Sequence, residues 1–146
     1  MVRKLAAIMG LAFGLLAPTS AFAQSATLPA SETALIDAVI DPLLAGLSGQ
    51  SSRSAVAGFF ATGTSDLPAE QLDQVVEKID SALEMFGPVQ RCEMFDQQLR
   101  STLIVQRKYA CQQRDRVSHW TFILKRLPDR WAAQKLSFST DVEELF

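Results

Sequence analysis

Asp96 and Arg107 are the two residues whose types and spacing best suit chemistry. They face each other across a hairpin in the register that sets Cys92 opposite Cys111. A carboxylate beside a guanidinium in a partly dry cavity can bind a polar ligand or take part in proton transfer. At the exposed edge of a sheet the same pair is an ordinary ion pair, worth roughly 0–1 kcal/mol. We favour the ion pair, and keep Asp96 as a candidate catalytic residue and Arg107 as a candidate ligand-binding residue.

The lone histidine and the two tryptophans are further candidates. His119 would need a partner and a pocket to act as a base, and on a polar strand face we expect it to be solvated. Trp120 is a candidate ligand-binding residue, because an indole ring can stack on a sugar or a peptide. We favour a core position for Trp120, and we expect Trp131 to cover the end of a hairpin.

The two cysteines, Cys92 and Cys111, predict a disulfide. An isolated pair in an oxidising compartment is usually bridged, and the spacing is not the Cys-x-x-Cys of a redox enzyme. Two cysteines and one histidine cannot form a zinc site without carboxylate ligands. The sequence also lacks a glycine-rich phosphate loop and a nucleophile elbow. We therefore expect no metal and no cofactor.

The first 23 residues have the pattern of a secretory signal peptide. Arg3 and Lys4 precede an uncharged run from Leu5 to Ala17, and Ala21 and Ala23 are the small residues that a signal peptidase recognises. A membrane anchor would need roughly 20 apolar residues, so this run is too short to span a bilayer. We expect a mature chain that starts at Gln24, has no membrane span and is periplasmic or secreted.

Charge is unevenly distributed along the mature chain. Acidic residues prevail before Pro88, and basic residues prevail after it. Such asymmetry can mark a surface that meets an anion, but solvated helix and strand faces are the commoner cause, and we favour that explanation. The mature chain as a whole is acidic, which argues against nucleic-acid binding.

Three helices are predicted in the first half of the mature chain. Ser31 suits the cap of the first helix, whose apolar residues recur at helical spacing. Pro42 lies inside this pattern and should kink or break it. A short second helix covers about residues 55–60. The third helix begins near Pro68, carries the clearest apolar stripe and ends at Gly87-Pro88.

After Pro88 the apolar period changes from that of a helix to that of a strand. Four strand-like runs follow, at about residues 89–98, 102–112, 117–127 and 131–140. The breaks between them are short, which predicts an antiparallel meander. Directly opposed residues share one face of a sheet, and we expect three such pairs in the last hairpin: Leu127 with Trp131, Phe122 with Leu136, and Trp120 with Phe138.

One face of the predicted sheet is apolar and the other is polar. The polar face carries His119, Thr121, Lys125, Lys135, Ser137 and Ser139. Helices should therefore cover the apolar face alone. In the first hairpin Met94 should face Tyr109 on the covered side, whereas a slip of one residue would turn Phe95 inward and Asp96 outward.

These predictions define a single α+β domain over residues 31–141, with N-terminal helices packed on one face of a four-stranded antiparallel meander sheet. A flexible lead-in at residues 24–30 precedes the domain. The tail at residues 142–146 is either a short docking segment or a frayed end.

Four short motifs carry a resemblance to a known group: Phe86-Gly87-Pro88-Val89, Trp120-Thr121-Phe122, Pro128-Asp129-Arg130-Trp131 and Leu136-Ser137-Phe138-Ser139. Over about residues 31–141 the chain resembles small exported bacterial proteins with the nuclear-transport-factor-2-like (cystatin-like) fold. The resemblance implies a helical half that wraps a curved antiparallel sheet. The fold hosts isomerases, dehydratases and binding subunits, so it implies no single function. Its enzymes often use an Asp or His inside the cone, and the resemblance implies Asp96 as the candidate catalytic residue here, with Tyr109 as its candidate partner. His119, in contrast, is expected outside the cone.

We favour an exported, non-catalytic module that binds a small ligand or an envelope protein. The alternative is a small enzyme of the isomerase or hydrolase type that uses Asp96 in a cone-shaped cavity. A third hypothesis is a structural accessory protein of the envelope. The exposed sheet face could pair with a second copy of the chain as a homodimer.

Overall fold

The computed structural model describes residues 27–49, 52–63 and 67–141. Three helices come first: α1 (Ala30–Gly46), α2 (Arg53–Ala61) and α3 (Ala69–Phe86). Four strands follow: β1 (Arg91–Ser101), β2 (Ile104–Gln112), β3 (Val117–Arg126) and β4 (Trp131–Ser139). The strands form one antiparallel sheet in the order β1-β2-β3-β4, as predicted.

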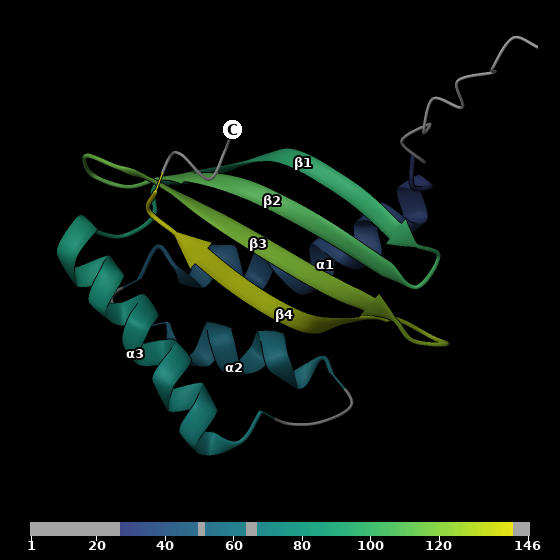
Figure 1. The fold of residues 1–146 in the computed structure, drawn as a ribbon, viewed down its shortest axis with the longest axis horizontal. Coiled ribbons are helices and arrows are strands. Elements are labelled where there is room, and N and C mark those ends of the chain that lie inside the picture. Colours follow the sequence, from purple (N-terminus) through teal and green to yellow (C-terminus); the bar gives the residue numbers. More distant parts are fainter. Residues whose placement is uncertain (1–26, 50–51, 64–66, 142–146) are drawn as a thin grey trace, which may run out of the picture.

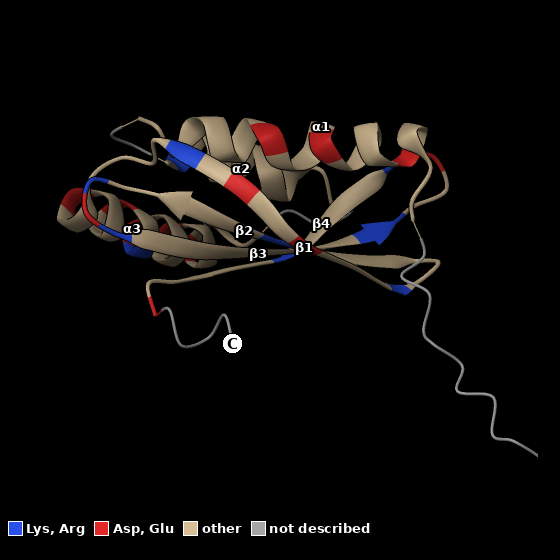
Figure 2. Ribbon diagram, turned by 90° about the horizontal axis from the view of Figure 1, so that it is seen from above, with Lys and Arg blue, Asp and Glu red and all other residues tan. Residues whose placement is uncertain are grey.

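The helices α1 and α2 lie on one side of the sheet, and α3 lies beside the sheet, beyond α2 and β4 (Figure 1 and Figure 2). Viewed from above, α1 runs along this side and carries several acidic residues (Figure 2). We call the helix-covered side of the sheet the inner face and the opposite side the outer face. The expected α+β architecture is therefore confirmed.

The predicted signal peptide, most of the lead-in and the C-terminal tail at 142–146 lie outside the described residues. None of the helices within the described ranges is long and apolar enough to cross a membrane.

The first helix differs from its prediction at two positions. Ser31 does not cap it, because α1 already begins at Ala30, after Pro29, and no side chain caps that end. Pro42 was expected to kink or break the helix, but α1 continues to Gly46. Pro42 has no backbone N–H, so the carbonyl of Ala38, four residues earlier, lacks its helical hydrogen bond. Both residues lie on the exposed side of α1, where water can bind this carbonyl instead.

Packing of the opposite side of α1 explains why the helix persists through Pro42. The buried residues of α1 flank the proline on both sides: Ile36, Val39, Ile40 and Leu43. They belong to one core with the buried side chains of the inner face, which include Val105, Tyr109, Trp120, Phe122 and Leu124. Burial of this stripe outweighs the loss of one backbone hydrogen bond.

The last hairpin largely follows the predicted register. Trp120 lies opposite Phe138 and Phe122 opposite Leu136, as expected. Nearer the turn the prediction is wrong, because Arg126 rather than Leu127 faces Trp131. A bulge after Ile123 shifts the register there by one residue.

The first hairpin contains a second bulge, and this one changes the candidate site. Cys92 faces Cys111 and Met94 faces Tyr109, as predicted, and a disulfide joins the two cysteines. The register then shifts between Met94 and Asp96, so that Asp96 faces Lys108 and Gln97 faces Arg107. The predicted pairing of Asp96 with Arg107 is therefore wrong. Lys108 belongs to the outer face, so the bulge places Asp96 there as well.

Candidate functional site

Arg107 is a buried charge on the inner face of the sheet. Its side chain is only 1% exposed and forms an ion pair, through Nη1, with the carboxylate of Asp37 in α1. Its Nε donates a hydrogen bond to Oε1 of Gln97 at 2.7 Å, and Nη1 lies 3.5 Å from the hydroxyl of Tyr109. Nη2 is buried and has no hydrogen-bond partner among the described residues. The strands thus place Arg107 beneath α1, and α1 supplies its partner.

Two side chains near Arg107 have raised pKa values. Burial, and then the charge of Asp37, raises the pKa of Asp41 above its usual 3.8, although Arg107 opposes this. Burial also raises the pKa of Tyr109 above 10, against the lowering effect of the Arg107 charge and hydrogen bond. Titratable groups with shifted pKa values often mark functional sites, but structural ion pairs shift them too.

The sequence prediction found part of this cluster and missed the rest. Arg107 and Tyr109 do lie together, but their acidic neighbours are Asp37 and Asp41 rather than Asp96. The sequence does contain a pattern that could have identified the two missed acids. They lie four residues apart in α1, and each directly follows a buried isoleucine. Such residues lie at the edge of the buried stripe, where a carboxylate can reach a buried cation.

Asp96 and Trp120 occupy different environments. The carboxylate of Asp96 accepts a hydrogen bond from Gln98 at 2.9 Å and lies 3.9 Å from Nζ of Lys108. Trp120 is 2% exposed, stacks on Phe138 with ring centroids 4.8 Å apart, and donates from Nε1 to Ser118 at 3.0 Å. Trp120 is therefore part of the core, as favoured from its sequence position.

His119 was expected to be solvated, and this is wrong. It does lie on the outer face, opposite Ser139, but it is only 7% exposed. The ring of Phe95 packs edge-on against it, with centroids 6.2 Å apart. The bulge in β1 brings Phe95 to the outer face next to Asp96, and its aromatic ring covers part of the imidazole.

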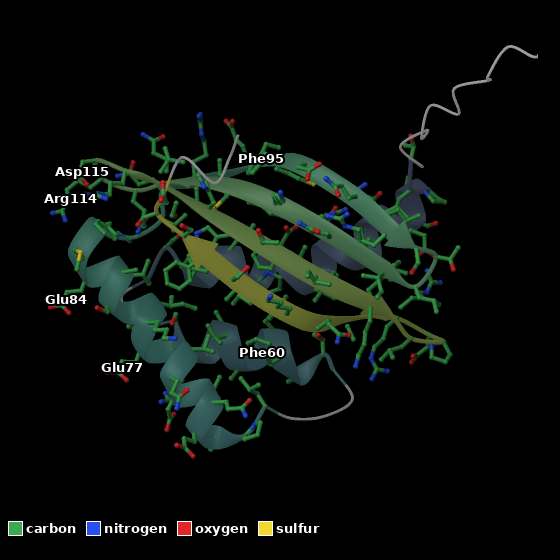
Figure 3. The ribbon with its side chains drawn as sticks, in the orientation of Figure 1. Phe60, Glu77, Glu84, Phe95, Arg114 and Asp115 are labelled. Carbon is green, nitrogen blue, oxygen red and sulfur yellow. A yellow bond between two sulfur atoms is a disulfide. The ribbon has the colours of Figure 1, made fainter. Side chains whose placement is uncertain are left out.

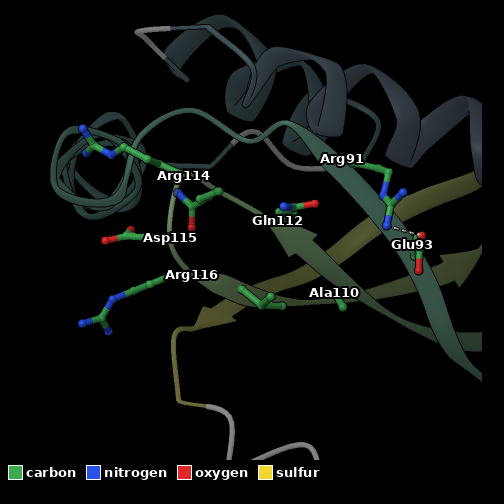
Figure 4. A pocket seen from close by; sticks show the side chains of 9 residues that line it. Arg91, Glu93, Ala110, Gln112, Arg114, Asp115 and Arg116 are labelled. Atoms are coloured by element: carbon green, nitrogen blue, oxygen red, sulfur yellow. Dashed lines mark ion pairs between the residues drawn. The ribbon is translucent and has the colours of Figure 1, made fainter.

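A polar cleft of about 370 Å³ lies at the end of the β2–β3 hairpin (Figure 4). We call it the arginine cleft; its lining residues are Arg91, Glu93, Ala110, Gln112, Gln113, Arg114, Asp115, Arg116 and Val117. Arg91 pairs with Glu93 at 2.9 Å on one side of it. Arg114 and Arg116 extend from the hairpin tip on the other side, around Asp115 (Figure 4).

The hairpin tip is held against the end of α3. The buried side chain of Gln113 donates from Nε2 to the carbonyl of Gly87 at 2.7 Å. Arg114 Nη2 lies 3.5 Å from the carbonyl of Met85, and the guanidinium of Arg116 lies 4.6 Å from the centre of the Phe86 ring. The last turn of α3 has no basic residue of its own, so these arginines provide the positive charge that a helix C-terminus favours.

A second cleft, of about 830 Å³, lies along α3 on the other side of this junction. We call it the α3 cleft; its lining residues are Gly49, Glu77, Asp80, Ser81, Leu83, Glu84, Gly87, Pro88 and Arg114. Glu77 and Glu84 lie on exposed positions of α3, and Figure 3 shows Arg114 beyond them at the hairpin tip. Arg114 lines both clefts, so an acidic and a basic lining meet at this residue.

Metal ligands are not clustered in the part of the chain that the structure describes: no group of three or more His, Cys, Asp or Glu side chains there could hold a metal ion.

Comparison with known proteins supports the fold. No protein-family model and no curated protein matches the sequence. A crystal structure of a domain of unknown function from Nostoc punctiforme, described as having a cystatin-like fold, matches with a TM-score of 0.53. The match covers 81% of this chain and 83% of that chain, at 10% sequence identity. The fold is cystatin-like. The resemblance predicted from the sequence motifs is thus confirmed for the fold, and at this identity the match carries no function.

Proposed function

We propose that the mature chain is exported and acts as a non-catalytic binding module. Its ligand is a short peptide segment of mixed charge, bound across the arginine cleft and the α3 cleft. The observation that carries this proposal is the position of Arg114, which lines both clefts at the point where acidic and basic side chains meet.

Two features support export to an oxidising compartment. Residues 1–23 have the charge and hydropathy pattern of a signal peptide, and Cys92 and Cys111 form a disulfide, a bond that persists outside the reducing cytoplasm. The mass of the intact protein recovered from its host tests this directly. We expect an N-terminus at Gln24, and retention of Met1 would contradict export by signal-peptide cleavage.

Charge complementarity supports a ligand that carries both signs. A guanidinium binds carboxylates through paired, planar hydrogen bonds, and Arg114 presents five N–H groups, of which the contact with Met85 engages one. The exposed carboxylates of Glu77 and Glu84 on α3 suit an ammonium or guanidinium group. An extended peptide with a basic and an acidic residue a few positions apart satisfies both linings.

The size and rigidity of the two clefts also support peptide binding. Their volumes, about 370 and 830 Å³, lie in or near the range of roughly 300–1,000 Å³ that is usual for ligand sites. The buried hydrogen bond from Gln113 to Gly87 holds the hairpin on α3. The two charged linings are thereby kept at a constant spacing, which reduces the entropy lost on binding.

Fluorescence anisotropy with short labelled peptides tests the proposal. A peptide with separated lysine and glutamate residues should bind more tightly than tetralysine or tetraglutamate. Arg114→Gln and Glu84→Gln should each weaken its binding by about tenfold or more, because charge-assisted hydrogen bonds contribute roughly 1.5–3 kcal/mol.

Arg100→Gln is the matched control, since Arg100 is an exposed arginine on β1 that does not line the described parts of these clefts. Its binding should equal that of the wild type. If Arg100→Gln weakened binding as much as Arg114→Gln, or if all three peptides bound equally well, the attraction would be non-specific and electrostatic. Either result would overturn the proposal.

The Arg107 cluster favours one alternative function, a small enzyme of the isomerase or hydrolase type. The carboxyl of Asp41 and the hydroxyl of Tyr109 have raised pKa values, and Arg107 Nη2 is buried without a partner in the described part of the chain. Asp41 would be the acid–base group, in place of the Asp96 expected from the sequence. Hydrolysis of p-nitrophenyl esters and deuterium exchange into simple ketones test this alternative; equal rates for the wild type and Asp41→Asn would exclude it.

A further inference from the structure

His119 on the outer face of the sheet is buried without hydrogen bonds. The residue is only 7% exposed, and neither Nδ1 nor Nε2 has a partner among the described residues. A neutral imidazole needs one donor and one acceptor, and a charged one needs two acceptors. Buried polar groups in folded proteins are normally paired, so this ring indicates a position where something else binds.

His119 lines a small cleft of about 70 Å³. The other lining residues are Phe95, Lys108, Thr121, Ser137, Phe138 and Ser139. In the sheet register Lys108, Thr121 and Ser137 form one row across three strands, and His119 and Ser139 form a neighbouring row. Opposed residues in such rows have Cβ atoms about 4.5–5.5 Å apart, so these polar groups converge on one place.

The polar groups of this cleft are mainly hydrogen-bond donors. Lys108 offers three N–H groups, a protonated His119 offers two, and the hydroxyls of Thr121, Ser137 and Ser139 each offer one. None of the described residues that line it is acidic. We propose that this outer-face cleft binds a small tetrahedral oxyanion, either sulfate or inorganic phosphate.

The volume favours a free ion over a larger molecule. At about 70 Å³ this cleft is much smaller than the arginine cleft, at about 370 Å³, and the α3 cleft, at about 830 Å³. The ring of Phe95 lines the same cleft and restricts its extent. If the phosphate group belonged to a larger molecule, the rest of that molecule would have to lie outside the cleft.

One carboxylate, that of Asp96, flanks the site and limits its positive charge. The Asp96 carboxylate lies 3.9 Å from Nζ of Lys108 and also accepts from Gln98. Asp141 follows β4, and its backbone N–H donates to Oγ of Ser139 at 3.1 Å, which leaves the Ser139 hydroxyl hydrogen to donate. Asp96 thus partly neutralises Lys108, and the uncharged donors of the cleft must supply part of the binding.

Sulfate is the suitable probe, because it is a tetrahedral oxyanion whose charge does not change near neutral pH. The measurement is a sulfate titration of the full mature protein by NMR at constant ionic strength, followed at the His119 ring and at the amides of β3 and β4. We expect saturable shifts confined to this cleft.

His119→Gln and Lys108→Gln should each weaken sulfate binding by about tenfold, because each removes a charge-assisted hydrogen bond. Ser137→Ala, a milder change, should weaken it by a smaller factor. Lys125→Gln is the matched control: it removes a positive charge from the same face of β3 and should leave binding unchanged. Overlaid amide spectra of the ligand-free variants confirm that each is folded.

Several outcomes would overturn the proposal. These are the absence of saturable shifts in the wild type, an equal loss in Lys125→Gln, or tighter binding of phosphoserine than of sulfate, which would indicate a larger ligand. Binding of the mixed-charge peptide should be unchanged in His119→Gln, so failure of one proposal is distinguishable from failure of the other.

Discussion

Replacement of Gly87 by alanine should destabilise the fold, because this residue has a backbone conformation that only glycine adopts readily. Its φ is 87° and its ψ is 167°. An alanine in this region costs about 1–3 kcal/mol, and the lower entropy of the unfolded variant offsets this cost by under about 1 kcal/mol. A Cβ at this position would also lie 3.4 Å from Cβ of Arg114.

The expected loss for Gly87→Ala is about 2 kcal/mol, to which weakening of the Gln113 hydrogen bond adds up to about 1 kcal/mol. Urea unfolding followed by tryptophan fluorescence measures it as a lower midpoint at an unchanged slope. Because Gly87 lies between the two clefts, the variant should also bind the mixed-charge peptide more weakly.

Gly58→Ala is the control of opposite sign. Gly58 lies inside α2, and a Cβ there meets no atom within 4 Å. Alanine should therefore stabilise the protein by about 0.5–1 kcal/mol through its higher helix propensity. The reasoning is refuted if Gly87→Ala unfolds at the wild-type midpoint, or if both variants shift the midpoint in the same direction.

Three further predictions concern the core, the disulfide and the Arg107 cluster. Phe122→Ala should cost about 3–5 kcal/mol in urea unfolding, because Phe122 is fully buried between two edge-to-face aromatic rings; a loss below about 1 kcal/mol would mean that the faces are inverted. Unreduced protein should contain no thiol that can be alkylated, and loss of the bridge between Cys92 and Cys111, which are 19 positions apart, should cost about 3 kcal/mol; two reactive thiols would contradict this. The raised pKa of Asp41 means that the folded state binds its proton more tightly than the unfolded chain, so ionisation costs stability at neutral pH. Asp41→Asn should therefore be more stable than the wild type at pH 7, and thermal unfolding should show this gain disappearing as the pH falls below about 3.8, where both states are protonated.

The sequence alone was sufficient for the order of the elements and for the faces of the sheet. The change from helical to strand periodicity after Pro88 is a local property, and so are the short breaks that make an antiparallel meander. The pairing of Trp120 with Phe138 was obtained by counting outward from the turn, and it holds because the bulge after Ile123 offsets the one-residue error at the turn. The bridge between Cys92 and Cys111 followed from an isolated pair of cysteines in a chain predicted to be exported. In each case the controlling forces act between residues that are near in sequence or directly opposed.

Only the tertiary structure decided the environment of the charged residues. One extra residue in β1 moves Asp96 to the outer face, and a bulge of this kind leaves no clear mark in the period of a strand. Arg107 pairs with Asp37, a residue 70 positions away, because the docking of α1 on the sheet determines which carboxylate reaches a buried guanidinium. Burial of His119 likewise depends on Phe95 from another strand. Secondary structure follows from local pattern, whereas the partner of a buried polar group depends on how the finished layers pack.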